Sequence, residues 1–233
     1  MVKNLQYTGS SLIQSERVEI FLGEFGSGKT ELAINCAMQM KSRGFKTAIV
    51  DIDIVKPYFR TRESRSLLEK SGIEVVAPDQ RMESTDLPIL PDNFTRVMKQ
   101  QDYKVVIDVG GGSSATVLGQ FNKLFLNNQY QAMLVVNAFR PFTSTVAAIV
   151  ELFHTIEQAS RLNISGIISN TNLAGETTEQ HIQAGLAIAE EAAVQLSVPI
   201  NGVVIPEWLA EKASSYPYPI FIIKPYTQYP WMM

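Results

Sequence analysis

The chain has 233 residues, a mass of 25.9 kDa and a formal net charge of −3 at neutral pH. Hydrophobic residues make up 45% of the sequence and charged residues 18%, which supports a folded core and excludes wholesale disorder. The slightly acidic balance provides no basic field, so we expect no nucleic-acid partner and no contact with an anionic membrane. The single cysteine, Cys36, and the two histidines exclude an internal disulfide framework and disfavour a zinc site or an iron–sulfur cluster.

The sequence lacks long apolar segments. No stretch approaches the roughly 18 apolar residues of a membrane span, and the first residues lack the apolar run of a signal peptide. We therefore expect a soluble, cytoplasmic protein. We predict a single domain over residues 1–233, with its core at about 16–209 and a C-terminal strand and extended arm at 210–233.

Short apolar runs alternate with helical patterns to near the C-terminus. Several runs, such as residues 105–107 and 132–136, are apolar without alternation, as expected of strands buried on both faces of a parallel sheet. The predicted strands are Val18–Leu22, Thr47–Asp51, Ile73–Ala77, Lys104–Val109, Gln131–Asn137, Ile164–Ser169, Asn201–Ile205 and Ile220–Ile223.

Helical periodicity fills the intervals between these runs. In the first interval Leu32, Cys36 and Met40 recur every four residues and form one apolar stripe, which predicts that Cys36 is a small core residue facing the sheet. The predicted helices are Thr30–Arg43, Thr61–Ser71, Ala115–Asn127, Ser144–Arg161 and Glu176–Leu196.

This alternation predicts an α/β fold with three layers: a mostly parallel, twisted sheet of seven to eight strands with helices on both faces. In such folds ligands bind beyond the carboxyl ends of the strands. The long Pro- and Asp-rich connection Pro78–Asn93 is interpreted as a lid or contact segment.

The first strand is followed by GEFGSGKT, a match to the G-x4-G-K-[ST] phosphate-binding motif, or P-loop. Glycines allow successive backbone N–H groups to point at phosphates, and the following helix adds its positive N-terminal dipole. Lys29 is expected to reach the β- and γ-phosphates, and the Thr30 hydroxyl to bind Mg²⁺. The predicted nucleotide-binding residues here are Gly23, Glu24, Phe25, Gly26, Ser27, Gly28, Lys29, Thr30 and Glu31.

Acidic residues stand at two predicted strand ends. Asp108 follows a buried strand, where a Walker B carboxylate would support Mg²⁺, and Gly111 after it would let a backbone N–H approach the γ-phosphate. Asp51 and Asp53 end the second strand and form a further pair of candidates. The sequence thus predicts a magnesium–triphosphate site.

The P-loop and the segment TAIVDID resemble the MinD/ParA branch of the P-loop NTPases, within the SIMIBI class. The resemblance implies that Lys29 and Asp51 are the catalytic residues. Asp51 would position the attacking water, and Asp53 would support Mg²⁺. The resemblance covers about residues 16–209.

Two further segments carry the same resemblance. GIISN resembles the strand whose final Asn, here Asn170, recognises adenine, and GVVIPE resembles a stretch that borders the base, which implies roles for Pro206 and Glu207. Asn170 is followed by Thr171, Asn172 and Leu173 and so departs from the N-K-x-D pattern of GTPases. The expected cofactors are therefore ATP and Mg²⁺.

The sequence also departs from the family. Family ATPases carry a signature lysine where this chain has Glu24, and that lysine crosses a dimer to touch the partner's phosphates. Its replacement argues against ATP-dependent dimerisation in the family's manner, and a homodimer stays an open alternative. We expect the Glu24 side chain to face away from phosphate or to bind a cation or partner. The C-terminus also lacks the basic amphipathic helix that tethers MinD-type proteins to membrane.

Two functions remain open at this point. The first is a slow ATPase that acts as a nucleotide-state switch for an unidentified protein partner. The second is an ATP-dependent transferase or ligase similar to dethiobiotin synthetase or the cobyrinate amidases, in which Arg60, Arg62 or Arg140 would hold a small anionic substrate. The segment 56–62 contacts nucleotide or partner in one interpretation, and anchors a loop and starts a solvated helix in the other.

Overall fold

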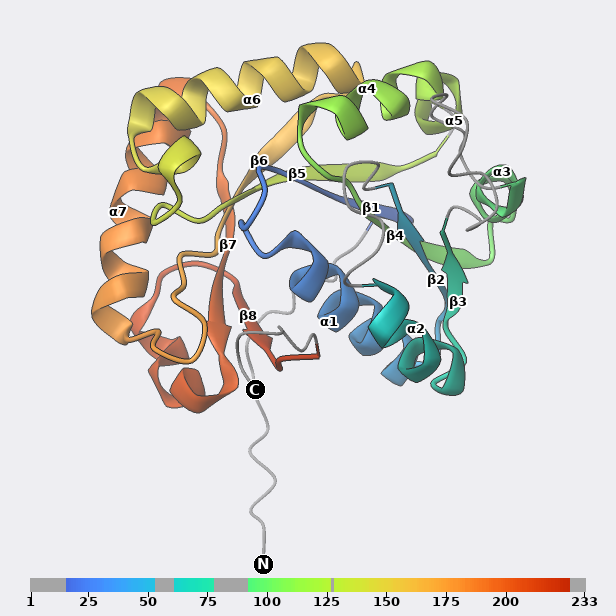
Figure 1. The fold of residues 1–233 in the computed structure, drawn as a ribbon, viewed down its shortest axis with the longest axis horizontal. Helices are drawn as coiled ribbons and strands as arrows, with labels where there is room; N and C mark the ends of the chain where they lie inside the picture. Colours follow the sequence, from blue (N-terminus) through green and yellow to red (C-terminus); the bar gives the residue numbers. More distant parts are fainter. Residues whose placement is uncertain (1–15, 53–60, 78–91, 127, 227–233) are drawn as a thin grey trace, which may run out of the picture.

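Eight strands form one sheet in the order β3-β2-β4-β1-β5-β6-β7-β8, and every neighbouring pair is parallel (Figure 1). The computed structural model describes residues 16–52, 61–77, 92–126 and 128–226. The strands are β1 Val18–Leu22, β2 Lys46–Asp51, β3 Glu74–Val76, β4 Tyr103–Asp108, β5 Tyr130–Val136, β6 Ile164–Ser169, β7 Ile200–Pro206 and β8 Ile220–Ile223.

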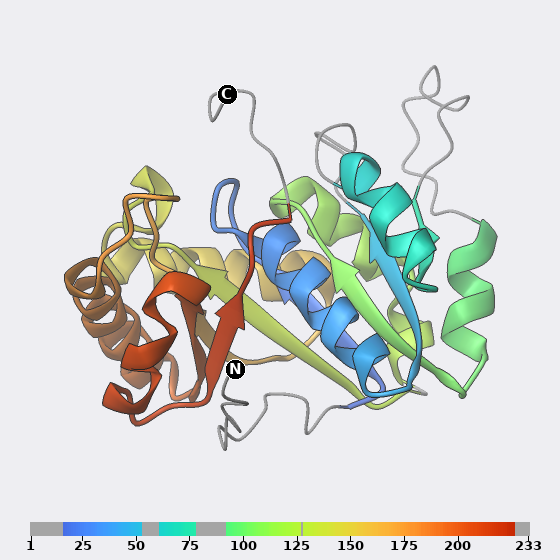
Figure 2. The same cartoon turned by 90° about the horizontal axis from the view of Figure 1, so that it is seen from below.

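Helices cover both faces of this sheet, which confirms the predicted three-layer α/β fold (Figures 1 and 2). The α-helices are α1 Lys29–Ser42, α2 Thr61–Lys70, α3 Asp92–Lys99, α4 Gly112–Gln120, α5 Asn122–Leu126, α6 Val146–Ser160 and α7 Glu179–Leu196. Two 3-10 helices, η2 Pro141–Thr143 and η3 Glu207–Ser215, follow β5 and β7.

Burial of the strands on both sides creates two apolar layers. Ile20 and Leu22 of β1 belong to the layer that packs beneath α3 to α7, whereas Phe21 belongs to the layer beneath α1 and α2. Successive strand side chains point to opposite faces, so a run such as Val18–Leu22 must be apolar throughout. The predicted stripe of α1 is buried, and Cys36 lies in the second layer as expected.

The order of the strands fixes where a ligand can bind. β1 lies between β4 and β5, so the chain leaves it in one direction toward β2 and later crosses to the other side. Sheets of this kind bind ligands at such a switch point, beyond the carboxyl ends of the strands. The P-loop leaves β1 at this point.

Besides shifts of a few residues at element ends, the structure differs from the predicted helices in two main places. The helix expected over Ala115–Asn127 is divided at Phe121 into α4 and α5, and α3 begins at Asp92, inside the segment predicted as a long connection. Residues 53–60 and 78–91, which include Asp53, Arg60 and most of that connection, lie outside the described part of the chain.

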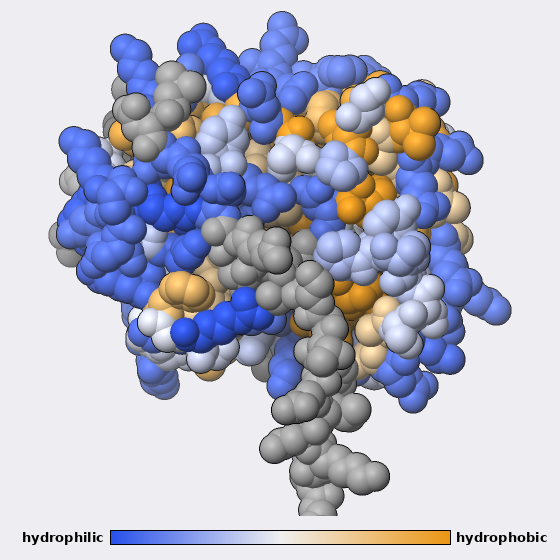
Figure 3. Space-filling view, turned by 180° about the vertical axis from the view of Figure 1, so that it is seen from behind, coloured by the Kyte–Doolittle hydropathy of each residue, from blue (hydrophilic) through white to orange (hydrophobic). Residues whose placement is uncertain are grey.

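The surface opposite the view of Figure 1 is mostly hydrophilic, with apolar residues gathered on one side (Figure 3). Within the described ranges, no helix is both long and apolar enough to cross a bilayer.

Candidate functional site: a phosphate loop beside a cavity

The loop after β1 requires glycine at two positions where its backbone lies close to neighbouring residues. Gly23 has φ +147°, and a Cβ there would lie 2.5 Å from the Val135 carbonyl oxygen of β5. Gly28 has φ +85°, and a Cβ there would lie 2.2 Å from Nδ2 of Asn170. Residues with a side chain rarely adopt these φ values, and the neighbouring atoms leave no room for one. The sequence pattern therefore folds into a tight loop that packs closely against Val135 of β5 and Asn170, the residue after β6.

The N-terminus of α1 opens from this loop. Its N-cap residue, Gly28, provides no side-chain hydrogen bond to the first turn. The Lys29 side chain, only 7% exposed, donates from Nζ to the Glu24 carbonyl oxygen at 2.9 Å and to Ser27 Oγ at 3.4 Å. A helix N-terminus with a lysine folded over the preceding loop is an arrangement suited to an anion.

Oxygen ligands gather next to this N-terminus. Thr30 Oγ1 donates to Asp108 Oδ2 at 2.6 Å, and Asp51 stands opposite Asp108 in the register of β2 and β4. Both carboxylates are buried. Hydroxyl and carboxylate oxygens are ligands that Mg²⁺ prefers, usually a few protein groups together with phosphate, so this donor set fits the ion.

The predicted magnesium ligand Asp53 needs separate comment. Asp53 lies outside the described residues, so its role stays a prediction. Among the residues that the structure covers, no group of three or more His, Cys, Asp or Glu side chains could hold a metal ion, so phosphate and water would have to complete the magnesium shell.

Glu24 turns toward the loop after β4. Its Oε1 accepts a hydrogen bond from the N–H of Phe25 at 2.8 Å, and a Cβ built on Gly111 would lie 3.3 Å from the same oxygen. The carboxylate therefore lies between the P-loop and Gly111, where the sequence had predicted a γ-phosphate contact.

A cavity of about 360 Å³ adjoins the P-loop. Gly26, Gly28 and Glu31 contribute from the loop and α1, and Asn170 and Pro206 contribute from the ends of β6 and β7. The structure thus brings together residues that the sequence predicted separately. The lining is mainly apolar with a few polar groups, as is typical of pockets for small organic ligands.

The Asn170 amide is held in one orientation. It is buried, and its Nδ2 donates to the Ser27 carbonyl oxygen at 2.6 Å. A flipped amide would place two oxygens together, so the hydrogen bond fixes Nδ2 on the P-loop. Oδ1 of Asn170 has no hydrogen bond to another described residue and remains an acceptor.

Some lining residues were missed or left ambiguous by sequence reasoning. Trp208, in η3, lines the cavity and its Nε1 donates to the Thr177 carbonyl oxygen at 3.5 Å. Arg140 also lines it, and its Nε donates to the Gly26 carbonyl oxygen at 3.2 Å. Predicted Glu207 does not line this cavity; its carboxylate lies 3.9 Å from Nζ of Lys224.

The fold and this site together define a three-layer α/β protein with an all-parallel sheet and a P-loop after its first strand. Comparison of the sequence with protein-family models and with curated proteins found no match.

Solved structures do match. The cell division protein FtsY of Thermotoga maritima aligns at 18% identity and a TM-score of 0.56, over 81% of this chain and 61% of that one. Chloroplast FtsY of Physcomitrella patens aligns at 18% identity and a TM-score of 0.56, over 80% of this chain and 57% of that one. The signal recognition particle 54 kDa protein of Aeropyrum pernix, in complex with GDP, aligns at 20% identity and a TM-score of 0.51, over 80% of this chain and 40% of that one. This chain therefore spans about three fifths or less of the length of these neighbours, and the likeness establishes the fold.

Proposed function

We propose that this chain binds a magnesium–nucleoside triphosphate at the P-loop, hydrolyses it slowly and acts as a nucleotide-state switch for a protein partner. The observation that carries the proposal is the hydrogen bond of 2.6 Å between Thr30 and Asp108 beside the N-terminus of α1. This hydrogen bond supports the proposal, because it joins a group expected to hold Mg²⁺ to the helix N-terminus expected to face the phosphates.

Each residue has a distinct role in this proposal. Lys29 would exchange its contacts with Glu24 and Ser27 for phosphate oxygens. Thr30 and Asp108 would hold the magnesium ion, directly or through water, with Asp53 as a predicted third group. Bound Mg²⁺ would neutralise charge on the phosphates.

Asp51 is the proposed positioning group for the attacking water. It is buried at the end of β2 and adjacent in register to Asp108. A carboxylate there can accept a proton or a hydrogen bond from water, the usual contribution of a general base.

The amide of Asn170 supports adenine as the base. Its available acceptor, Oδ1, suits the exocyclic amine of adenine, whereas guanine presents two adjacent donors that a carboxylate would pair better. Glu31 is the one carboxylate that lines the described cavity, and its Oε1 already accepts a hydrogen bond from the N–H of Tyr226 at 2.5 Å. Guanine is the competing base, because the 54 kDa neighbour was solved in complex with GDP.

The transferase alternative depends on Arg140. Its guanidinium lines the cavity and has donors besides the Nε that contacts Gly26, so it could hold a carboxylate substrate. Turnover that depends on a small carboxylic acid, rather than on an added protein, would support this function instead.

Calorimetric titration of the purified chain with ATP and with GTP, each with and without Mg²⁺, tests the proposal. We expect magnesium-dependent binding of both or of ATP alone, with ATP tighter. Tighter GTP would correct the base assignment, and failure of both nucleotides to bind would overturn the proposed function.

A further inference from the structure

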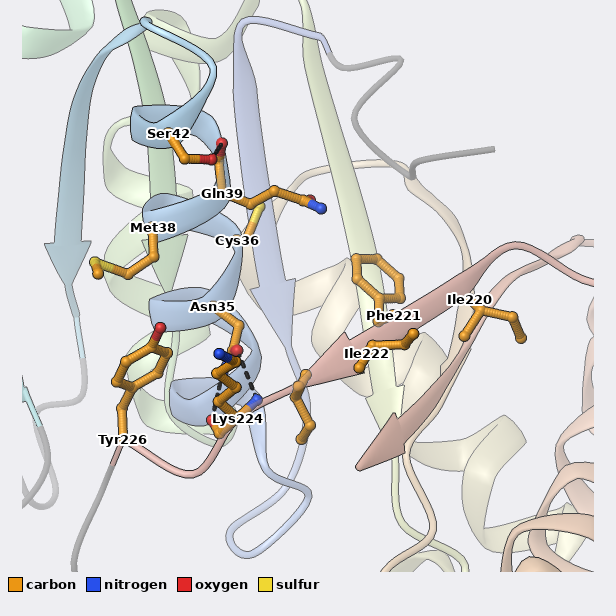
Figure 4. A pocket seen from close by; sticks show the side chains of 11 residues that line it. Asn35, Cys36, Met38, Gln39, Ser42, Ile220, Phe221, Ile222, Lys224 and Tyr226 are labelled. Carbon is orange, nitrogen blue, oxygen red and sulfur yellow. Dashed lines mark hydrogen bonds between the residues drawn. The ribbon is translucent and has the colours of Figure 1, made fainter. Parts of the chain in front are cut away.

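The chain continues from β8 into a short segment, residues 224–226, that we call the strap. Asn35 of α1 holds it with a reciprocal pair of hydrogen bonds: Nδ2 donates to the Lys224 carbonyl oxygen at 2.9 Å, and the Lys224 N–H donates to Oδ1 at 2.9 Å (Figure 4). One side-chain amide therefore satisfies both main-chain groups of Lys224, as a neighbouring strand would.

A second hydrogen bond from the same helix extends this attachment. The Tyr226 N–H donates to Oε1 of Glu31, which lies one turn before Asn35 on the same face of α1. Both anchors belong to the helix that begins at Lys29. The strap is therefore bound to the element whose N-terminus faces the proposed phosphate position.

The strap lies between two hollows. Pro225 and the last residue of β8, Ile223, line the cavity of about 360 Å³ beside the P-loop. Lys224 and Tyr226 line a second hollow, of about 300 Å³, between α1 and β8 (Figure 4). Movement of the strap would therefore open the first cavity toward the second.

We propose that the strap is a docked wall of the nucleoside pocket and that Asn35 is the positioning residue that holds it closed. This inference rests on the proposed function, because it assigns the cavity to the nucleoside part of the nucleotide. Strap docking and base binding are then linked: a nucleoside that contacts Ile223 and Pro225 stabilises the docked strap, and a docked strap raises nucleoside affinity by the same factor. Lys29 and Thr30, the residues proposed to hold phosphate and Mg²⁺, do not line this cavity, so we expect phosphate binding to be independent of the strap.

The test compares ATP with inorganic tripolyphosphate, each with Mg²⁺, by calorimetry. Asn35→Ala removes two hydrogen bonds to Lys224, and we expect ATP affinity to fall about tenfold while tripolyphosphate affinity is unchanged. Asn35→Asp keeps an acceptor for the Lys224 N–H but turns a carboxylate oxygen toward the Lys224 carbonyl and the Glu31 carboxylate, so its loss of ATP affinity should be at least as large as that of Asn35→Ala. Gln39→Ala is the matched control, because Gln39 lies one turn further along the same face and lines the second hollow without bonding the strap.

Hydrogen exchange provides a readout that needs no variant. In the wild-type protein, exchange at the amides of Lys224 and Tyr226 should slow with ATP and not with tripolyphosphate. The strap inference would be overturned if ATP and tripolyphosphate protected these amides equally. It would also be overturned if Asn35→Ala bound ATP with wild-type affinity, or lost affinity for both ligands to the same extent. If instead the wild-type chain binds neither ligand, or Lys29→Ala binds tripolyphosphate like the wild type, it is the proposed function that fails.

Discussion

The hydroxyl of Thr30 donates to the carboxylate of Asp108 across 2.6 Å, although the two residues are 78 positions apart in the sequence. The bond joins the first turn of α1 to the end of β4. Two separate motifs, the P-loop and the acidic strand end, thereby become one site.

Thr30→Val tests this relationship, because it removes the hydroxyl and keeps the shape. We expect the magnesium-dependent part of nucleotide affinity to be lost, since the ion loses a ligand, and stability to fall by about 1–3 kcal/mol as buried Asp108 loses a donor. Calorimetry with and without Mg²⁺ and urea unfolding measure the two effects. Thr30→Ser should restore both; a valine variant with an unaltered response to Mg²⁺ would argue against the assignment.

Asp51→Ala separates binding from hydrolysis. If Asp51 positions the attacking water, the variant should bind Mg-ATP normally and hydrolyse it about 100-fold more slowly or worse. Phosphate release under saturating nucleotide checks the rate, and calorimetry checks binding. Loss of binding would instead show that Asp51 acts on the magnesium ion.

Much of the fold follows from local patterns in the sequence. The bounds of β1, β6 and β8 are those predicted, because apolar runs between turn residues define buried strands. The helix α3 was missed because it begins within a Pro- and Asp-rich segment, where composition favours a loop. The break at Phe121 was missed because the apolar pattern continues across it.

The site could be predicted where its residues are close together in the sequence. Gly23–Thr30 and the acidic strand ends carry their own signals, but the wall of the cavity does not. Asn35 and Lys224 meet across 189 positions, and Arg140 reaches Gly26 across 114. These contacts depend on how strands are ordered in the sheet, which no local pattern encodes.

Gly28→Ala should destabilise the loop more than Gly44→Ala does. Both glycines have positive φ, +85° and +88°, but a Cβ at Gly44 meets nothing within 4 Å whereas one at Gly28 lies 2.2 Å from Nδ2 of Asn170. The Gly44 variant should lose about 1–2 kcal/mol from backbone strain alone. Urea unfolding of both variants measures the difference, and equal losses would mean that the loop is not pressed against Asn170.

Glu19 predicts how stability depends on pH. Burial raises the pKa of this carboxyl from 4.5 to about 8, with Lys104 opposing the rise and Glu16 adding to it, and its Oε1 has no hydrogen-bond partner within the described ranges. Between these two values the folded state holds a proton that the unfolded state releases. The stabilising contribution of protonated Glu19 is therefore complete below pH 4.5 and declines as the pH rises to about 8.

Replacing the carboxyl should remove this dependence. In that window the free energy of unfolding should fall by about 1.4 kcal/mol per pH unit on account of Glu19, and Glu19→Gln should flatten the curve. Urea unfolding from pH 5 to pH 8 measures the slope, with Glu151→Gln, on the exposed face of α6, as control. Parallel curves for the wild type and Glu19→Gln would contradict the prediction.

The most direct measurement is a calorimetric titration of Lys29→Ala with Mg-ATP, beside Lys123→Ala, whose exposed side chain lies on α5 away from the P-loop. Removing the ammonium group that faces the loop should abolish detectable binding, because no other described lysine reaches Glu24 and Ser27. Lys123→Ala should bind like the wild type. Unchanged affinity in Lys29→Ala would contradict the assignment of this loop as the triphosphate site.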